Sequence, residues 1–191
     1  YSLDLYLRIA PELYLKQLLV GGLDRVYEVN RSFRNEGVST KHNPEFTMLE
    51  IYSAYANYED MMNLVQELII FIARDVLGKA EFVYQDKAVD LKAPWQRRSF
   101  AQMVKEKFGI SPDDTVAVML KKLQAKGNAL DKTQLTRSQV AKIIEDILEE
   151  DMSVNPAFVT DYFTSFCPLA KAKKENPLIS ERFELYIAGL E

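Results

Sequence analysis

The stretch FRNEGVSTKHNPEFTMLEIY, residues 33–52, gathers charged side chains around one glycine and one proline. Apolar and polar side chains alternate in two segments, which is typical of half-buried strands. The segments are residues 25–34, which lead into this stretch, and residues 45–55, which end it and continue beyond it. The sequence therefore predicts a β-hairpin with a long polar connection that ends at Asn43-Pro44. Ordinary turns need only Gly, Pro, Asn, Asp or Ser, so the additional charge in this connection requires an explanation.

Strand alternation predicts which side chains of this hairpin share a face. On the first strand the shared face carries Glu28, Ser32, Arg34 and Glu36. On the second strand it carries Phe46, Met48, Glu50 and Tyr52. The register is open, so the two sets face the same side or opposite sides. An arginine fork suits carboxylate or phosphate, and carboxylates suit a cationic group. The alternative is a half-exposed sheet face with cross-strand ion pairs of little energetic value.

The rest of the chain predicts an α+β fold. Alternation over residues 1–10 predicts a strand, and residues 11–20 predict a helix closed by Gly21-Gly22. A helix is expected between a cap at Asn57 and a stop at Gly78, followed by a hairpin over 81–92 around Gln85-Asp86. Residues 99–152 predict helices, with Ser99 and Ser138 as N-caps, and strands return at 157–163 and 182–190. We expect three segments: a core over 1–97, a helical insertion over 98–155 and a return to the core over 156–191.

Composition excludes several classes of function. The 191 residues are 48% hydrophobic and 27% charged with a formal net charge of −4, so the chain has no overall basic footprint for nucleic acid. The only cysteine and the only histidine, Cys167 and His42, allow no disulfide and no cysteine–histidine metal site. A reducing, cytoplasmic location is expected, without membrane attachment. Neither a GxGxxG motif nor a GxxxxGK phosphate loop is present.

The segment FRNEGVSTKHNPEFTMLE, residues 33–50, resembles motif 2 of the class II aminoacyl-tRNA synthetases, and in its details the lysyl-tRNA synthetases. The resemblance extends upstream through LYLRIAPELYLKQLLVGGLDRVYEVNRSFRNEG, and downstream through PLAK (168–171) and RFELYIAGLE (182–191). It implies an antiparallel sheet of the class II synthetase type flanked by helices, with a helical insertion.

This resemblance implies a role for each residue of the predicted site. Arg34 would grip the α-phosphate of ATP and lie close to the carboxylate of the amino acid. Around the nucleotide, Glu36, His42 and Asn43 would lie near adenine or the loop, and Phe46 would stack on adenine. Glu12 would take the α-ammonium of lysine, while Glu50 and Tyr52 would hold its ε-ammonium. Glu184 and Glu191 would bind Mg²⁺ and phosphates, and a bulge at Gly189 would bring them to one face.

The implied activity is lysine activation by ATP to lysyl-adenylate, with transfer to tRNA(Lys) by a full-length homodimer. Because the motifs that complete the family's site do not occur in residues 1–191, we expect a catalytic-core fragment that is inactive by itself. Two alternatives remain open at this point. One is a synthetase-like lysyl ligase that loads a protein acceptor, and the other is a catalytically inactive module derived from a synthetase.

Overall fold

The computed structural model describes residues 2–39, 42–128 and 135–191. Helices and strands occupy separate stretches of this described part, which confirms the α+β class. The chain divides into two compact units, a first unit that ends at Asn57 and a second unit that begins at Tyr58. The division expected from composition, at 97/98 and 155/156, is a different one and stays a prediction. The polar loop of the hairpin includes residues 40 and 41, which lie outside the described residues.

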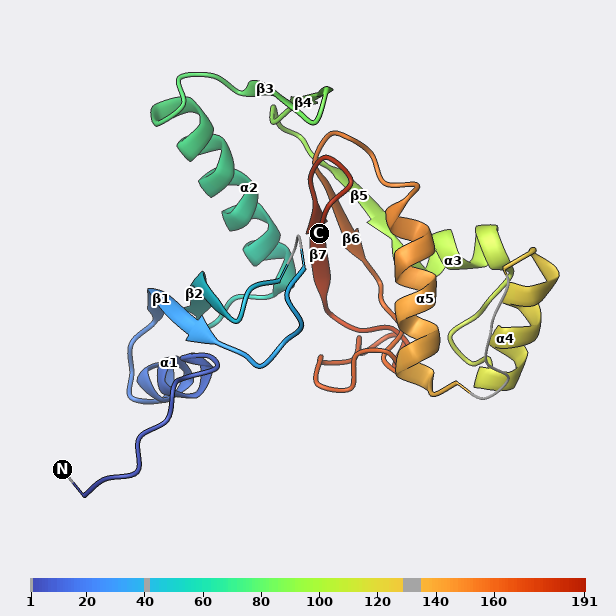
Figure 1. Cartoon of the computed structure of the whole chain (residues 1–191), viewed down its shortest axis with the longest axis horizontal. Helices are drawn as coiled ribbons and strands as arrows, with labels where there is room; N and C mark the ends of the chain where they lie inside the picture. Colours follow the sequence, from blue (N-terminus) through green and yellow to red (C-terminus); the bar gives the residue numbers. More distant parts are fainter. Residues whose placement is uncertain (1, 40–41, 129–134) are drawn as a thin grey trace. The chain divides into compact units, whose positions relative to one another are not determined.

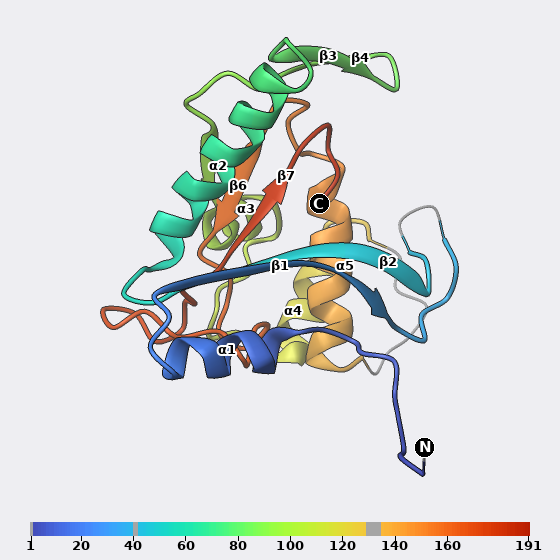
Figure 2. The ribbon, with the colours of Figure 1, turned by 90° about the vertical axis from the view of Figure 1, so that its left-hand side faces the viewer.

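The described residues of the first unit form one helix and one hairpin. Helix α1 (Glu12–Val20) has Pro11 at its N-cap and Gly21 at its C-cap. Strands β1 (Arg25–Phe33) and β2 (Glu45–Ser53) pair antiparallel along their whole length. Figure 2 shows the two strands lying along each other with α1 beside them. The helix and the hairpin predicted from the sequence are confirmed.

The strand predicted over residues 1–10 is wrong for the described residues 2–10. This segment has no strand assignment, although Phe33 N donates to Arg8 O at 2.8 Å. The apolar side chains of its alternating pattern are exposed, namely Leu3, Leu5, Leu7 and Ile9. An alternating pattern gives a strand only where a partner strand and a core are present. The described residues provide neither for this segment.

The second unit contains the remaining elements. It begins with helix α2 (Tyr58–Asp75) and the hairpin of β3 (Glu81–Tyr84) and β4 (Lys87–Asp90). A separate three-stranded sheet has the order β5 (Gln96–Ser99), β6 (Ala157–Thr160), β7 (Phe183–Tyr186). Between β5 and β6 the chain forms helices α3 (Phe100–Phe108), α4 (Val116–Ala125) and α5 (Arg137–Glu149). None of the helices in the described part of the chain has the length and apolarity needed to cross a membrane.

The three-stranded sheet is mixed, which differs from the antiparallel sheet that the resemblance implied. Strand β5 pairs with β6 in parallel, whereas β6 pairs with β7 antiparallel. Parallel neighbours require a long crossover, usually a helical one, and helices α3–α5 lie within that crossover. The sequence did not predict β5, because Gln-Arg-Arg-Ser has no apolar alternation and the strand lies at an edge of the sheet.

The two faces of this sheet belong to two different hydrophobic clusters. Phe158 of β6 packs with Met62 of α2 and with Trp95, whose ring centroid is 5.5 Å away. The next residue, Val159, belongs to the cluster formed with α3, α4 and α5. Successive strand residues point to opposite faces, so β6 contributes to both clusters through Phe158 and Val159. Figure 1 shows α2 on one side of the sheet and α3–α5 on the other.

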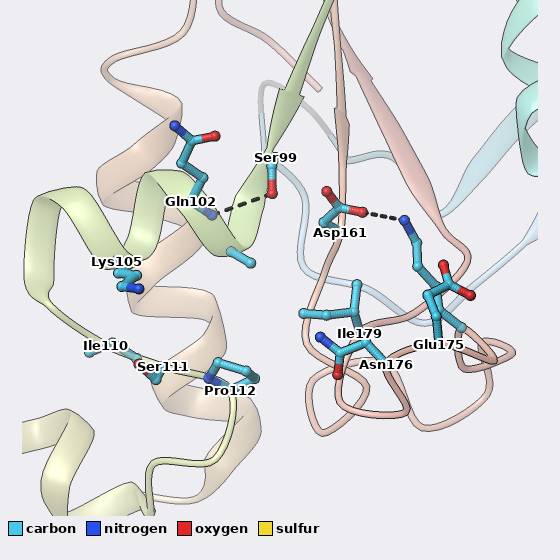
Figure 3. Close-up of a pocket in the computed structure, with 12 residues that line it drawn as sticks. Ser99, Gln102, Lys105, Ile110, Ser111, Pro112, Asp161, Glu175, Asn176 and Ile179 are labelled. Atoms are coloured by element: carbon cyan, nitrogen blue, oxygen red, sulfur yellow. Dashed lines mark hydrogen bonds and ion pairs between the residues drawn. The ribbon is translucent and has the colours of Figure 1, made fainter.

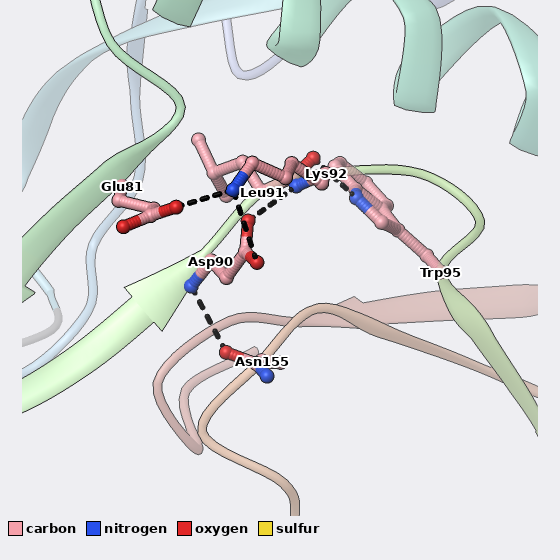
Figure 4. Close-up of polar contacts among 6 residues, drawn as sticks. All are labelled: Glu81, Asp90, Leu91, Lys92, Trp95 and Asn155. Atoms are coloured by element: carbon pink, nitrogen blue, oxygen red, sulfur yellow. Dashed lines mark hydrogen bonds and ion pairs between the residues drawn. The ribbon is translucent and has the colours of Figure 1, made fainter.

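The predicted hairpin over 81–92 is confirmed. Gln85 and Asp86 connect β3 and β4 with φ values of 47° and 61°, the combination found in type I′ turns. Polar contacts then connect the hairpin to the rest of the second unit (Figure 4). Asp90 N donates to Asn155 Oδ1 at 2.9 Å, and the Trp95 indole N–H donates to Leu91 O at 2.9 Å.

Side-chain caps start the three crossover helices. Ser99 caps α3, as the sequence predicts, and Thr115 caps α4. The cap of α5 is Thr136 rather than the predicted Ser138, which lies inside the helix. Thr136 Oγ1 accepts from Gln139 N at 3.3 Å, and Gln139 Oε1 accepts from Thr136 N at 2.9 Å. This reciprocal capping box satisfies two donors at the helix end, which Ser138 cannot do from its position.

We expect Thr136→Ala to lower the free energy of unfolding by about 1 kcal/mol, because the substitution removes the capping oxygen of α5. The matched control is Ser138→Ala, whose hydroxyl contacts only the Thr136 hydroxyl among the contacts identified for it, at 3.0 Å. Urea denaturation of both variants measures the difference. Equal destabilisation by the two substitutions would contradict the assignment of Thr136 as the cap.

Candidate functional site

The register of the first hairpin decides which polar side chains share a face. Glu28 lies opposite Glu50, and Ser32 lies opposite Phe46. Residues directly opposite each other in an antiparallel pair project to the same side. The strand residues of the two sets, namely Glu28, Ser32, Phe46, Met48, Glu50 and Tyr52, therefore lie on one face together with Asn30, and Arg34 follows directly after β1. The polar hairpin face, as we call this set, holds the centre of the predicted site.

At one end of the polar hairpin face, Glu50 and Tyr52 form a bonded pair. The Tyr52 hydroxyl donates to Glu50 Oε2 at 2.8 Å, and both side chains are half-buried. Burial, and then the hydrogen bond and charge of Glu50, raise the pKa of the Tyr52 phenol, with a smaller contribution from Glu12. The phenol is therefore a stable donor, and the carboxylate keeps lone pairs for another partner.

Helix α1 brings two further charges to this end of the face. Glu12 is the first residue of α1 and Lys16 lies one turn later. Lys16 Nζ is 2.5 Å from Glu12 Oε1 and 6.0 Å from the centroid of the Tyr52 ring. Glu12, Lys16, Glu50 and Tyr52 thus lie together at this end of the face, and we call these four residues the Glu50 cluster.

Glu28 and Glu50 are like charges that lie directly opposite each other, an arrangement that is unfavourable by itself. Arg8 from the N-terminal segment offsets it, because its NH1 is 2.6 Å from Glu28 Oε1. The Arg8 Nε also donates to Arg31 O at 3.1 Å, which holds the guanidinium over β1. Glu28 is therefore paired with a cation within the first unit, whereas none of the contacts identified for Glu50 is with a cation.

Arg34 and Phe46 lie at the other end of the polar hairpin face. Arg34 directly follows β1, and its backbone N donates to Pro44 O at 3.0 Å across the start of the loop. Its guanidinium carbon lies 5.2 Å from the centroid of the Phe46 ring, and its Nε donates to Ile9 O at 3.3 Å. The guanidinium is exposed, and none of the contacts identified for it is with a carboxylate, so its charge is available to an anionic ligand.

The remaining loop residues of the predicted site are exposed. The Glu36 backbone N donates to Arg34 O at 2.9 Å, which turns the chain directly after Arg34. His42 Nδ1 lies 2.9 Å from Ser39 Oγ, and His42 N donates to the same oxygen at 3.1 Å. Asn43 is exposed between His42 and Pro44. The structure therefore places these three residues beyond the strand ends, in the same loop as Arg34.

Glu184, in the second unit, is surrounded by protein partners. Its side chain is 10% exposed and forms an ion pair with Arg182 through Oε1. Oε2 accepts from the Tyr162 hydroxyl at 2.5 Å and from the Tyr186 hydroxyl at 3.1 Å. Arg182 also lies 4.9 Å from the Tyr162 ring centroid, and its NH1 is 2.8 Å from Cys167 Sγ. Both oxygens of Glu184 are therefore occupied within the protein.

Gly189 lies in a tight turn after β7 rather than in the expected bulge. Strand β7 ends at Tyr186, and Ile187 and Leu190 exchange backbone hydrogen bonds of 2.9 and 3.0 Å. Ala188 and Gly189 between them have φ values of 57° and 81°, so the chain reverses in a tight turn. Burial raises the pKa of Glu145 in α5, where the Glu191 carboxylate adds to the effect and Arg182 opposes it.

Glu184 and Glu191 are the predicted metal ligands. Within residues 2–39, 42–128 and 135–191, no group of three or more histidine, cysteine, aspartate or glutamate side chains is placed to hold a metal ion. Arg182 already neutralises Glu184, and two phenols use its second oxygen. As arranged, the carboxylates of Glu184 and Glu191 do not form a ready cation site, since a divalent ion would compete with Arg182.

A separate open pocket of about 560 Å³ lies in the second unit, between the start of α3 and the loop after β6 (Figure 3). Asp161 and Lys173 line it and form an ion pair of 2.6 Å. The hydrogen bond and charge of Asp161 raise the pKa of Lys173, with a further contribution from Tyr58. The residues that line the pocket include none of those predicted for the site, and we assign it no chemistry.

Sequence reasoning missed the residues that hold the site side chains in place. Lys16 had a readable signal, because it follows Glu12 by four residues on a predicted helix. Arg182 precedes Glu184 by two residues and so lies on the same side of a strand. Arg8 and Tyr162 had no such signal, because their contacts with Glu28 and Glu184 connect segments far apart in the sequence.

Known proteins resemble this chain along its full length. It is 45% identical over 192 residues to the lysine–tRNA ligase of Thermotoga maritima, a match that covers 100% of the chain and 38% of that relative. The lysine–tRNA ligases of Pelotomaculum thermopropionicum and Carboxydothermus hydrogenoformans are 48% and 47% identical, again over 100% of the chain and over 38% and 39% of the relatives. The chain thus spans about two fifths of the length of these curated relatives.

The model of the family described as tRNA synthetases class II (D, K and N) matches residues 1–191. This match includes both compact units and the whole polar hairpin face. The chain therefore belongs to the class II tRNA synthetases of the D, K and N group.

Proposed function

We propose that this chain is part of a lysine–tRNA ligase, which activates lysine with ATP and transfers it to tRNA(Lys). The observation that carries the proposal is the Glu50 cluster, in which two carboxylates and a phenol lie near one cation. The relatives of this chain include lysine–tRNA ligases. The relatives named above are all lysine–tRNA ligases, which gives the two alternative functions no support. The class II sheet arrangement, a homodimer and a cytoplasmic location belong to the same proposal.

Lysine would bind at the end of the polar hairpin face near Tyr52. Its ε-ammonium would lie against Glu50 and the Tyr52 hydroxyl, and its α-ammonium against Glu12. A cation removed from water needs paired acceptors, and the half-buried Glu50 supplies one whose position the Tyr52 hydroxyl fixes at 2.8 Å. A neutral side chain of similar length would leave this carboxylate unpaired, which provides selectivity for lysine.

ATP would bind at the opposite end of the face. Phe46 offers a ring for the adenine, and Glu36, His42 and Asn43 lie in the loop that would surround the nucleotide. Arg34 would contact the α-phosphate with its fork, which suits phosphate geometry. About 3.3 Å of strand per residue separates Phe46 from Glu50 by roughly 13 Å. This span leaves room for the ribose, the phosphate and the carboxylate of lysine between the two ends.

The reaction requires positioning more than proton transfer. An oxygen of the lysine carboxylate attacks the α-phosphorus, a new O–P bond forms, and pyrophosphate leaves with the electrons of the broken P–O bond. Because the nucleophile is already an anion, no side chain must act as a general base. Arg34 would offset the charge that develops at phosphorus. The Glu50 cluster would bind lysine so that its carboxylate lies in line with the α-phosphorus. The transfer step to tRNA follows from the family alone.

Divalent metal at Glu184 and Glu191 also remains a prediction. Carboxylate oxygens are the ligands that Mg²⁺ prefers, and it commonly binds one or two of them together with phosphates. Mg²⁺ would supply neutralising charge on the phosphates. For Glu184 to take part, its ion pair with Arg182 must open, so Arg182 and the metal would bind this carboxylate alternately.

In the full encoded protein, we expect Glu50→Gln to lower kcat/KM for lysine by roughly 30-fold or more, since a charged hydrogen bond to a desolvated partner is worth about 2–5 kcal/mol. The KM for ATP should change little, because ATP binds at the other end of the face. The matched control is Glu45→Gln, which removes a carboxylate of the same strand that pairs with Arg31 on the opposite face. Lysine-dependent ATP–pyrophosphate exchange measures both. An unchanged kcat/KM for lysine would reduce Glu50 to a structural residue.

We expect Arg34→Lys to lower kcat in the same exchange assay by about 10²–10³, because the charge remains but the bidentate fork at the α-phosphate is lost. Arg31→Lys, in the same strand and paired with Glu45, serves as the control and should keep kcat within about twofold. Retention of full kcat by the Arg34 variant would show that the reacting phosphate does not depend on this side chain.

A further inference from the structure

Lys16 occupies a position at which the proposed substrate, lysine, would bind. Its Nζ is 2.5 Å from Glu12 Oε1 and 6.0 Å from the Tyr52 ring centroid. Glu12 and Tyr52 are the residues to which we assign the two ammonium groups of lysine. The Lys16 side chain ends in the same ammonium as the substrate, so one chemical group of the protein already satisfies part of the lysine site.

The charges of the Glu50 cluster lead to the same conclusion. Glu12 and Glu50 contribute two negative charges and Lys16 contributes one positive charge, which leaves one negative charge. Free lysine carries two ammonium groups, so complete pairing requires both carboxylates. Only Glu50 is without a cationic partner among the contacts identified for this cluster. The α-ammonium of lysine must therefore compete with Lys16 for Glu12.

A surface ion pair of this kind is easily exchanged. The side chains of Lys16 and Glu12 are 53% and 50% exposed, and exposed pairs at this spacing contribute little to stability. Lys16 can leave Glu12 for water at low cost, since its long side chain carries the ammonium outward. The pair thus neutralises Glu12 in the absence of substrate without blocking the site permanently.

We propose that Lys16 is an internal counter-ion of the lysine site, which occupies Glu12 in the free protein and is displaced by the α-ammonium of the substrate. This inference rests on the proposed function, because it assumes that lysine binds at Glu12, Glu50 and Tyr52. Lys16 is a residue that tunes affinity and takes no part in the reaction. It weakens the binding of every ligand that needs Glu12 and leaves unaffected a ligand that needs only Glu50 and Tyr52.

The test is isothermal titration calorimetry of the full encoded protein with lysine. Lys16→Met keeps the length of the side chain and removes its charge. The matched control is Lys142→Met, which breaks another exposed i,i+4 pair, with Asp146 in α5 at 2.7 Å. We expect Kd for lysine to fall about twofold to fivefold in the first variant and to stay constant in the second. The gain should shrink as salt is added, since exposed charges are screened.

A second ligand separates competition at Glu12 from a general effect of charge. The probe is 6-aminohexanoate, which is lysine without its α-ammonium, measured by displacement of radiolabelled lysine. Its Kd should be the same in wild type and Lys16→Met, because it has no α-ammonium that would bind Glu12. An equal gain for both ligands would overturn the counter-ion role. So would an unchanged or higher Kd for lysine in both Lys16→Met and the second variant, Lys16→Gln.

Failure of the proposed function gives a different result. If the wild-type protein binds no lysine, both proposals fail together. If wild type binds lysine and Glu12→Gln abolishes the effect of Lys16→Met, the counter-ion role is supported. If wild type binds lysine and the Lys16 variants do not bind it more tightly, only the counter-ion role fails, and the pair with Glu12 is a helix-surface contact.

Discussion

The pairing of Glu28 with Glu50 and of Ser32 with Phe46 is the constraint on which the candidate site depends. Side chains alternate along a strand with a period of two, so a slip of one residue would move a whole set to the other face. With this register, the residue pattern of β1 and that of β2 form a single polar surface. The same register places two glutamates opposite each other, a repulsion that Arg8 and Tyr52 offset in different ways. Arg8 neutralises one carboxylate, whereas Tyr52 only orients the other.

This difference explains why one hairpin can present two chemically distinct ends. At Glu50 and Tyr52 the face is rich in acceptors, and at Arg34 and Phe46 it offers a cation and an aromatic ring. The strands separate these ends by several residues, and Asn30 and Met48 lie opposite each other between them. A ligand with a cationic end, a central anion and an aromatic base would match the order of these groups. In the second unit, Glu184 also has several partners, since its single carboxylate accepts from two tyrosines and pairs with Arg182.

Much of this could be predicted from the sequence, because the deciding signals were local. The hairpin, the turn at Gln85-Asp86 and the cap at Ser99 follow from residues that act on their immediate neighbours. Strand β5 could not be predicted, since its polar residues form a strand only when β6 supplies a ladder. Thr136 and Ser138 are both good caps, and the helix start distinguishes them only through Gln139. The partners of Glu184 and of Glu28 come from distant segments, for which one sequence contains no spacing signal.

The parallel pairing of β5 with β6 has a consequence for the order of folding. Gln96 must meet Ala157, and contacts between residues so far apart in sequence form slowly because a long loop must close first. Until they meet, α2 and α3–α5 have no common sheet to cover, so both hydrophobic clusters of the second unit stay open together. The first unit has no such delay, because β1 and β2 follow each other in the sequence and residues 34–44 between them are far fewer than those of the crossover. During synthesis, which proceeds from the N-terminus, the hairpin can therefore form before the chain has made the strand that completes the second unit. The exposed cores of α2 and α3–α5 are then the surfaces that a chaperone would have to protect.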